Sequence, residues 1–480
     1  MINNKKIDKK RIILLLLGPL SYILSRMFLQ DLFGFEGASA LGVSFWMVLW
    51  WVTGPVGVGV AAMVPVAVNA IFEFTAMGDI IAQYSSATVI LLFGAGLLTQ
   101  PWTKIGLDRR VALFGLRIVG PSIKGQMVAW FTVSLLLSTV LPNFATIVLL
   151  CPVAAAMLHE LDDRDLAHSD LTTPILSPIV MGSCVGGGIT PLGGAMNIIA
   201  MDAVSAHSGV EFLFMDWVIR MAPFVLILGI VHATITAITP TKRKKIEGTK
   251  EYFKQKYDEL GVFSRDEKIY LFLFILAGAL CFLRPLYTEI LPGLIPSYVL
   301  LIFGMLGFVL TDQKGETFLT FENAAKNTSW NVLFIVAGAS ILGVILQATG
   351  TITVLSQMIS SVKISNDFLL MLMFVTLSST LTLFASATTT SGVMVPLVIT
   401  VTSALGQNPI PYVFAVCLGF SNPQVGPVSV GVIMGYGAKL SDIIKRNWPL
   451  LIVHVILTTV LCWLAMNYVP YFSNLPGFTG

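Results

Sequence analysis

Two stretches rich in glycine and proline interrupt long apolar runs of the chain. The first reads GGGITPLGGAMN over residues 186–197, and the second reads NPQVGPVSVGVIMGYG over residues 422–437. Glycine permits backbone conformations that other residues avoid, and Pro191 lacks the N–H that a continuing helix needs. The first stretch therefore predicts a helix that splits near residues 187–196. Free N–H groups at a half-helix favour anions, and free carbonyl groups suit a cation such as Na⁺.

Small polar residues gather at two further interruptions, where we expect the chain to turn back within an apolar run. Asn143 and Thr146 stand at the first, and Ser386, Thr388 and Thr390 stand at the second. A hydroxyl in a membrane helix often bonds to its own backbone, so one such residue is weak evidence for a site. The two tips and the two split stretches together offer hydroxyl, amide and backbone groups without a carboxylate. This pattern disfavours a proton relay of Asp, Glu or His and favours an anionic substrate.

Composition identifies the elements that must position these groups. The 480 residues are 55% hydrophobic and 11% charged, whereas soluble domains carry about 25% charged residues. We therefore expect an all-α polytopic membrane protein with about 11 transmembrane helices. The candidate spans are residues 12–30, 40–55, 57–74, 87–99, 172–201, 215–239, 269–290, 294–311, 331–349, 408–436 and 448–470.

Lysine and arginine residues are concentrated in segments 5–11, 104–124, 242–268 and 439–446. All four segments share one side of the membrane only if residues 127–158 and 366–401 enter and leave by the same face. Both are therefore predicted to be re-entrant hairpins. Because basic loops mark the cytoplasmic side, we expect an inner-membrane protein with its N-terminus in the cytoplasm and its C-terminus outside.

An internal repeat orders these elements into two halves. Residues 91–98 echo residues 333–343, and Asn143, Thr146 and Pro152 match Ala387, Thr390 and Pro396 at equal spacing. The predicted topology gives the two halves opposite orientations, which is typical of secondary transporters with paired discontinuous helices. We divide the chain into an N-terminal tail with the first helix (1–39), a first repeat (40–240), a cytoplasmic connector (241–268) and a second repeat (269–480).

At these residues the chain resembles the divalent anion:sodium symporter (DASS) family. The segments ALGVSFWMVLWWVTGPVG (40–57), GLDRRVALFGLR (106–117) and WNVLFIVAGASILG (330–343) are similar to family segments, and the likeness follows nearly the whole chain. The resemblance implies eleven spans, two re-entrant hairpins, inverted repeats, a homodimer and an elevator movement of a transport domain. It also implies uptake of di- or tricarboxylates or sulfate, usually with Na⁺.

The family carries a Ser-Asn-Thr motif at each hairpin tip, which this chain keeps only in part. The first tip reads Pro142-Asn143-Phe144, so a hydroxyl is lost and bulk is added, and the second reads Ser386-Ala387-Thr388, so the Asn is lost. By resemblance, Ser138, Asn143 and Gly193 surround one sodium ion, and Thr382, Ala385, Ala387 and Gly426 surround a second. The residues expected to contact substrate are Asn143, Thr146, Ser386, Thr388, Thr390 and Pro427.

We therefore expect a secondary transporter for a small anion, first of all a di- or tricarboxylate, coupled to Na⁺ through the first-half site. The alternatives are a Na⁺-independent exchanger, a carrier of another anion such as sulfate, and a non-transporting sensor. An intramembrane enzyme is disfavoured, since the single HE pair, His159-Glu160, lacks the second His of HExxH. The expected partners are the anion, Na⁺, membrane lipid and a second copy of the chain, with no nucleic acid, cofactor or other metal.

Overall fold

The computed structural model describes residues 9–117, 119–162, 165–351, 354, 366–384, 386–422 and 427–474. Helices dominate these ranges, and no extended strand is formed within them beyond two isolated bridges. In the described residues seven helices are long and apolar enough to cross a membrane, and shorter apolar helices accompany them. The all-α membrane fold predicted from composition is thereby confirmed.

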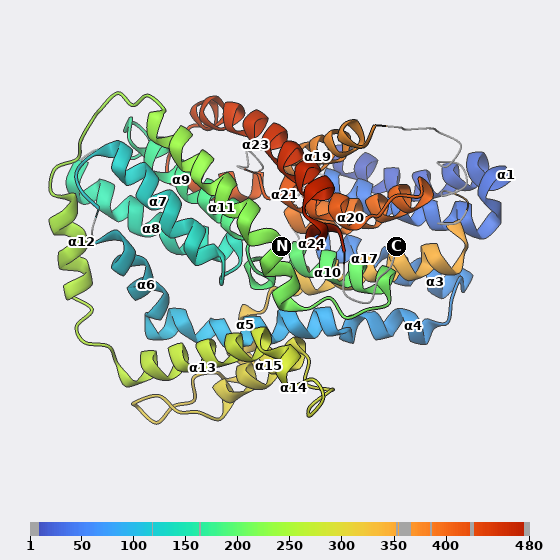
Figure 1. Cartoon of the computed structure of the whole chain (residues 1–480), viewed down its shortest axis with the longest axis horizontal. Helices are drawn as coiled ribbons and strands as arrows, with labels where there is room; N and C mark the ends of the chain where they lie inside the picture. Colours follow the sequence, from blue (N-terminus) through green and yellow to red (C-terminus); the bar gives the residue numbers. More distant parts are fainter. Residues whose placement is uncertain are drawn as a thin grey trace, which may run out of the picture.

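The first half of the chain runs from one end of the elongated body to the other (Figure 1). Its helices are α1 (Lys9–Thr53), α2 (Val58–Ala61), α3 (Val64–Phe72), α4 (Met77–Ala82), η1 (Gln83–Ser85), α5 (Ala87–Ile105), α6 (Leu107–Leu116), α7 (Ile123–Ser138), α8 (Asn143–Asp162), α9 (Thr172–Gly186), η2 (Pro191–Gly193), α10 (Ala195–Ser208), α11 (Phe214–Ile238) and α12 (Thr249–Asp258).

The second half follows the connector helix α12 and returns toward α1 (Figure 1). Its helices are α13 (Arg265–Phe282), α14 (Arg284–Tyr287), α15 (Pro296–Met305), η3 (Leu306–Phe308), α16 (Phe321–Asn327), α17 (Trp330–Ala348), α19 (Asp367–Phe384), α20 (Ala387–Ala404), α21 (Ile410–Phe420), α22 (Pro427–Gly435), α23 (Leu440–Tyr468) and α24 (Pro470–Ser473).

Helix α1 contains the first expected span, 12–30, and all but the last two residues of the second, 40–55. Its helical dihedral angles break at Gly34, with φ 70° and ψ 175°. The two parts lie side by side, because Trp50 Nε1 donates to Leu15 O at 3.2 Å and Ser25 Oγ donates to Ala38 O at 2.8 Å. The element is therefore a helical hairpin rather than one long rod.

The two hairpins, α7–α8 and α19–α20, contact their following helices through matched residues. Ser134 Oγ on α7 donates to Ile179 O on α9 at 2.6 Å, and Ser378 Oγ on α19 lies 3.3 Å from Val416 O on α21. Asn143 and Ala387 occupy the same place relative to these contacts, at the start of α8 and of α20. The matched serines of the internal repeat thus both lie against the following helix, although Ser378 Oγ also lies 3.1 Å from Val375 O of its own helix.

The hydrophobic core brings helices from both halves together around the hairpin tips. One cluster joins Val89 of α5, Ala195 of α10 and Val336 of α17. Ser391 Oγ of α20 donates to Met196 O of α10 at 2.7 Å, so the second hairpin rests on the split helix of the first half. These contacts place the second hairpin beside α10 and α17.

Candidate functional site

The first hairpin tip is fastened to the helix that follows it. Helix α7 ends at Ser138, whose Oγ donates to Ser183 O on α9 at 2.8 Å. Within the break, Thr190 Oγ1 donates to Thr139 O in the turn of the hairpin. The tip therefore holds both α9 and the interrupted stretch that follows it.

The interruption itself accepts no side chain at two of its glycines. A Cβ on Gly187 would lie 1.9 Å from Asn143 Oδ1, and a Cβ on Gly193 would lie 2.3 Å from Gly187 O. Asn197 Nδ2 spans the break by donating to Gly187 O at 2.6 Å and to Thr190 O at 2.8 Å. The sequence GGGITPLGGAMN thus lets the backbone approach the hairpin tip closely, as predicted from its glycines.

The amide of Asn143 stands at the centre of this arrangement. Its inner atom lies 2.9 Å from Ser138 Oγ, 2.9 Å from Gly193 O and 3.2 Å from Ser183 O. With nitrogen inward, the amide donates hydrogen bonds to these oxygens. With oxygen inward, it completes a set of four oxygens, which is the ligand type that a hard monovalent cation prefers. The structure brings Ser138, Asn143 and Gly193 together.

The second tip, between α19 and α20, carries different side chains. Ser386 Oγ caps α20 by accepting from Thr389 N at 3.1 Å, and Thr382 Oγ1 lies 2.7 Å from Ser378 O and 3.2 Å from Thr390 Oγ1. Ala387 offers no polar side-chain atom where Asn143 stands in the first half. Of the residues expected near a second sodium ion or the substrate, Ala385 and Gly426 lie outside the described residues, as does the side chain of Pro427.

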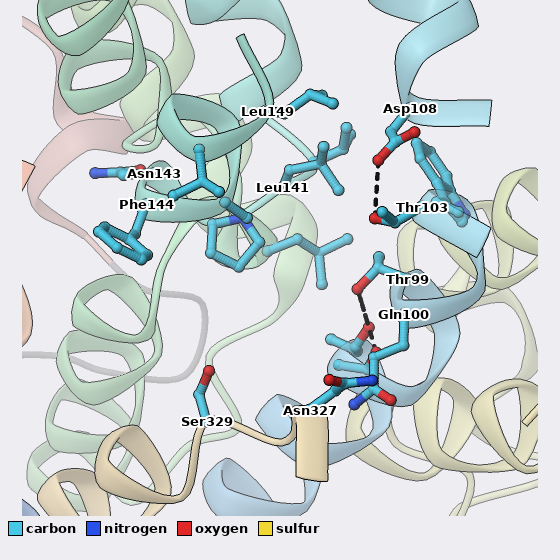
Figure 2. A pocket seen from close by; sticks show the side chains of 18 of the residues that line it. Thr99, Gln100, Thr103, Asp108, Leu141, Asn143, Phe144, Leu149, Asn327 and Ser329 are labelled. Atoms are coloured by element: carbon cyan, nitrogen blue, oxygen red, sulfur yellow. Dashed lines mark hydrogen bonds between the residues drawn. The ribbon is translucent and has the colours of Figure 1, made fainter. Parts of the chain in front are cut away.

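A cavity of about 1120 Å³ lies between the two tips and helix α5. Figure 2 shows Asn143 and Phe144 on one side of it and Thr99, Thr103 and Asp108 on the other. Ser386 and Thr388 line it as well. Thr146 and Thr390 are buried behind the wall, at 0% and 2% exposure, and are not among the lining residues.

Three helices begin at the wall of this cavity. The lining includes the first residues of α8, α10 and α20, namely Asn143, Ala195 and Ala387. The first turn of a helix has N–H groups without intrahelical partners and carries a partial positive charge. The cavity is therefore suited to an anion although the tips carry no formal positive charge.

The sequence pattern missed two polar features near the site. Asn422, at the end of α21, donates to Ser379 O at 3.2 Å and to Gly419 O at 3.0 Å, and so joins the second hairpin to its split helix. His232 and His454, which look isolated along the chain, stack at 5.2 Å between ring centroids. The pairing of two histidines on distant helices leaves no periodic signal in the sequence. Asn422 could have been found, because it is the first residue of the second interrupted stretch.

Comparison with known proteins agrees with this architecture. A family model described as a citrate transporter (CitMHS) matches residues 48–419, which is more than half of the chain. The chain belongs to this citrate transporter family. The sodium-dependent dicarboxylate transporter SdcS of Staphylococcus aureus (strain bovine RF122 / ET3-1) is 24% identical over 453 residues, covering 90% of this chain and 86% of SdcS. Together these matches confirm the DASS resemblance and identify an integral membrane protein of a transporter family.

Two solved structures share the fold at low sequence identity. The Alcanivorax borkumensis YdaH transporter is similar with a TM-score of 0.52 and 14% identity, covering 85% of this chain and 91% of that one. Neisseria gonorrhoeae MtrF is similar with a TM-score of 0.53 and 13% identity, covering 96% and 95%. Both likenesses concern the helical architecture.

Proposed function

We propose that the protein is a secondary active transporter that carries a small carboxylate anion, first of all a dicarboxylate, across the cytoplasmic membrane with Na⁺ as the coupling ion. Three oxygens, Ser138 Oγ, Ser183 O and Gly193 O, converge on the Asn143 amide, and turning the amide oxygen toward them would complete a four-oxygen site. This convergence carries the proposal. The name of SdcS, which refers to sodium and dicarboxylates, and the citrate transporter family support the same class of substrate.

The ion and the substrate would share one structural element, the first hairpin tip. Na⁺ bound by Ser138, Asn143, Ser183 O and Gly193 O would fix the start of α8, whose free N–H groups line the cavity. A carboxylate between the starts of α8 and α20 would then meet an ordered set of donors. Coupling follows because each ligand binds more favourably once the other has ordered the tip.

The wider arrangement is part of the proposal. The two hairpins with α9–α11 and α21–α23 would move as one body against α1–α5 and α13–α17, and two copies of the chain would form a homodimer with cytoplasmic N-termini. A native mass equal to two chains tests the dimer. Cross-links between α10 and α17 that stop uptake test the movement.

A second candidate is a Na⁺-independent anion exchanger. Ala387 favours it, because the position that matches Asn143 has no ligand atom. The two candidates separate in reconstituted vesicles. Uptake of labelled succinate that requires an inward Na⁺ gradient supports the symporter, whereas uptake that persists in K⁺ and requires internal succinate supports exchange. Citrate in place of succinate tests the tricarboxylate in the same assay.

A further inference from the structure

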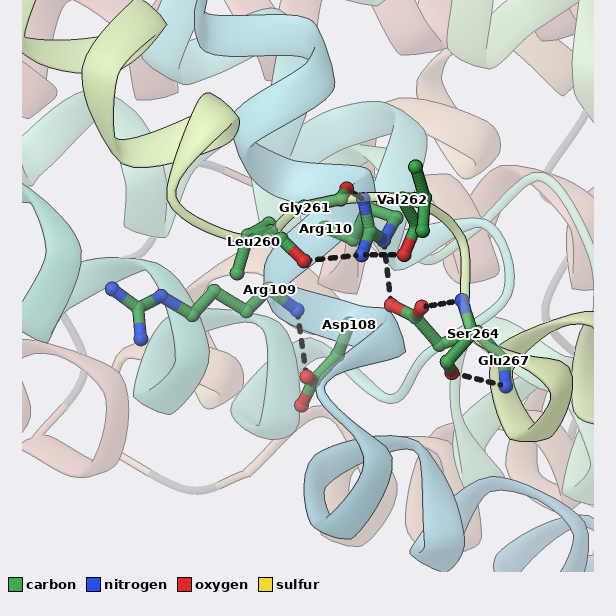
Figure 3. Close-up of polar contacts among 8 residues, drawn as sticks. All are labelled: Asp108, Arg109, Arg110, Leu260, Gly261, Val262, Ser264 and Glu267. Atoms are coloured by element: carbon green, nitrogen blue, oxygen red, sulfur yellow. Dashed lines mark hydrogen bonds and ion pairs between the residues drawn. The ribbon is translucent and has the colours of Figure 1, made fainter. Parts of the chain in front are cut away.

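Two adjacent arginines at the start of α6 point in opposite directions (Figure 3). Arg110 is buried and fully engaged: Nε donates to Glu267 Oε1 at 2.6 Å, and its Nη atoms donate to Gly261 O at 2.9 Å and Leu260 O at 3.0 Å. Burial alone would raise the pKa of the Glu267 carboxyl, but hydrogen bonds from Arg110 and Ser264 hold that pKa below its ordinary value. The charge of Arg110 is therefore balanced within the protein.

The Arg109 side chain points the other way, and Asp108 fixes the backbone at its base. Asp108 Oδ1 accepts from Arg109 N at 2.6 Å, and Asp108 Oδ2 accepts from Thr103 Oγ1 of α5 at 2.8 Å. These bonds fix the first turn of α6 against the end of α5. The Arg109 side chain lines the large cavity, at the end formed by α6 and α12.

The charge of Arg109 is available to a ligand. Three cations line the cavity, and two of them have acidic neighbours: Lys104 lies 3.6 Å from Asp312, and Lys256 lies 3.4 Å from Glu259. Within the part of the chain that the structure describes, Arg109 forms no ion pair, and its side chain is exposed. A guanidinium offers a planar set of donors that matches both oxygens of a carboxylate.

We infer that Arg109 is a recruiting site for carboxylate anions at the α6–α12 mouth of the cavity, separate from the hairpin tips. The identity of the anion rests on the proposed function, but the attraction itself depends only on charge. A cation in a low-dielectric wall concentrates anions near it and speeds their arrival. The substrate would meet Arg109 first and then pass to the neutral donors at the starts of α8 and α20.

The local potential can be measured without transport. Val148 lines the cavity and is 47% exposed, whereas the five native cysteines are buried. In the Val148→Cys protein, the reaction rates of a sulfonate and an ammonium methanethiosulfonate reagent are compared. We expect Arg109→Gln to lower the sulfonate-to-ammonium rate ratio on the order of tenfold at low salt, and Arg109→Glu to lower it further. Arg109→Lys should keep the ratio.

The matched control is Arg265→Gln, which removes an exposed arginine that does not line the cavity. An unchanged ratio in Arg109→Gln, or an equal change in Arg265→Gln, would overturn the inference. In succinate transport from the α6–α12 side, we expect Arg109→Gln to raise KM about tenfold with little change in maximal rate, and less so at high salt. Absence of succinate transport in the unaltered protein would refute the proposed function but leave the reagent test intact.

Discussion

The two hairpin tips occupy matched places in the internal repeat and differ in the side chain at the start of their second helix. In the first half, Asn143 places its amide within 2.9 Å of Ser138 Oγ and Gly193 O. In the second half, Ala387 stands in the matching place, and Thr382 Oγ1 turns to Ser378 O of its own helix instead. Ser134 and Ser378 nevertheless both lie against the helix that follows their hairpin. Among the described residues, an amide that faces a hydroxyl and two backbone carbonyls is found at the first tip, and Ala387 stands in its place at the second.

This difference separates residues that hold the fold from residues that hold a ligand. A repeat preserves its architecture as long as the contacts between hairpin and split helix remain, because these bury the polar backbone of the interruption. A residue that only contacts a ligand does not bury this backbone, so it can be replaced without loss of the fold. The first tip is therefore expected to bear the coupling ion, with the substrate between the two tips.

The largest effect is expected from Asn143→Ala. The substitution removes the amide that lies within 3.2 Å of Ser138 Oγ, Ser183 O and Gly193 O. Loss of a ligand of this kind costs about 2 kcal/mol, which corresponds to roughly 30-fold weaker activation by Na⁺. This weakening is measured as an increase in the Na⁺ concentration that gives half-maximal succinate uptake. Unchanged Na⁺ activation would show that the first tip does not bind the ion.

Gly187→Ala should have the next largest effect. Its Cβ would lie 1.9 Å from the Asn143 amide oxygen and would push the tip from the break. Overpacking costs about 1–3 kcal/mol, so we expect about tenfold weaker Na⁺ activation and a lower unfolding temperature. Gly278→Ala is the control, since nothing lies within 4 Å of its Cβ. Equal Na⁺ activation and equal unfolding temperatures in the two variants would contradict the close approach of Gly187 to Asn143.

Ala387→Asn tests whether the missing amide explains the difference between the two tips. It restores an amide where the second half lacks one, and we expect Na⁺ to bind there as well. Na⁺ activation of uptake should then become steeper, with an increase of a few-fold in apparent affinity. A curve identical to that of the unaltered protein would mean that residues other than Ala387 prevent ion binding at the second tip.

The smallest effects should come from Ser134→Ala and Ser378→Ala, and they should be similar. Each removes one buried hydrogen bond between hairpin and split helix, worth about 1 kcal/mol. We expect small decreases in unfolding temperature, of about 2 °C, with Na⁺ activation unchanged. A large effect from one and none from the other would show that the halves are not packed alike.

Much of this architecture was predictable because it follows from local chemistry. A glycine- and proline-rich stretch in an apolar run has to break the helix, and Pro191 indeed begins the short η2 between α9 and α10. The equal spacing of Asn143 and Ala387 identified the matched tips. The position of side chains relative to a cavity wall was not predictable in this way. Thr146 and Thr390 carry the expected hydroxyls but lie behind the wall, because the helix turn places them there.

Contacts between distant segments were also beyond the sequence pattern. Nothing in the order of residues indicates that Asn197 spans the break or that His232 stacks on His454. Nor does it indicate that Arg110 pairs with Glu267 while Arg109 points away from that pair. Such contacts depend on which helix faces pack together, which is decided by the whole fold.

The most direct test of the central claim is the Na⁺ dependence of labelled succinate uptake into vesicles containing the unaltered protein or Asn143→Ala. One ion site in the first half predicts a hyperbolic curve with a Hill coefficient of about 1, and a half-maximal Na⁺ concentration roughly 30-fold higher in Asn143→Ala. A sigmoidal curve that survives Asn143→Ala would contradict the account, because it would place cooperative ion binding outside the first tip.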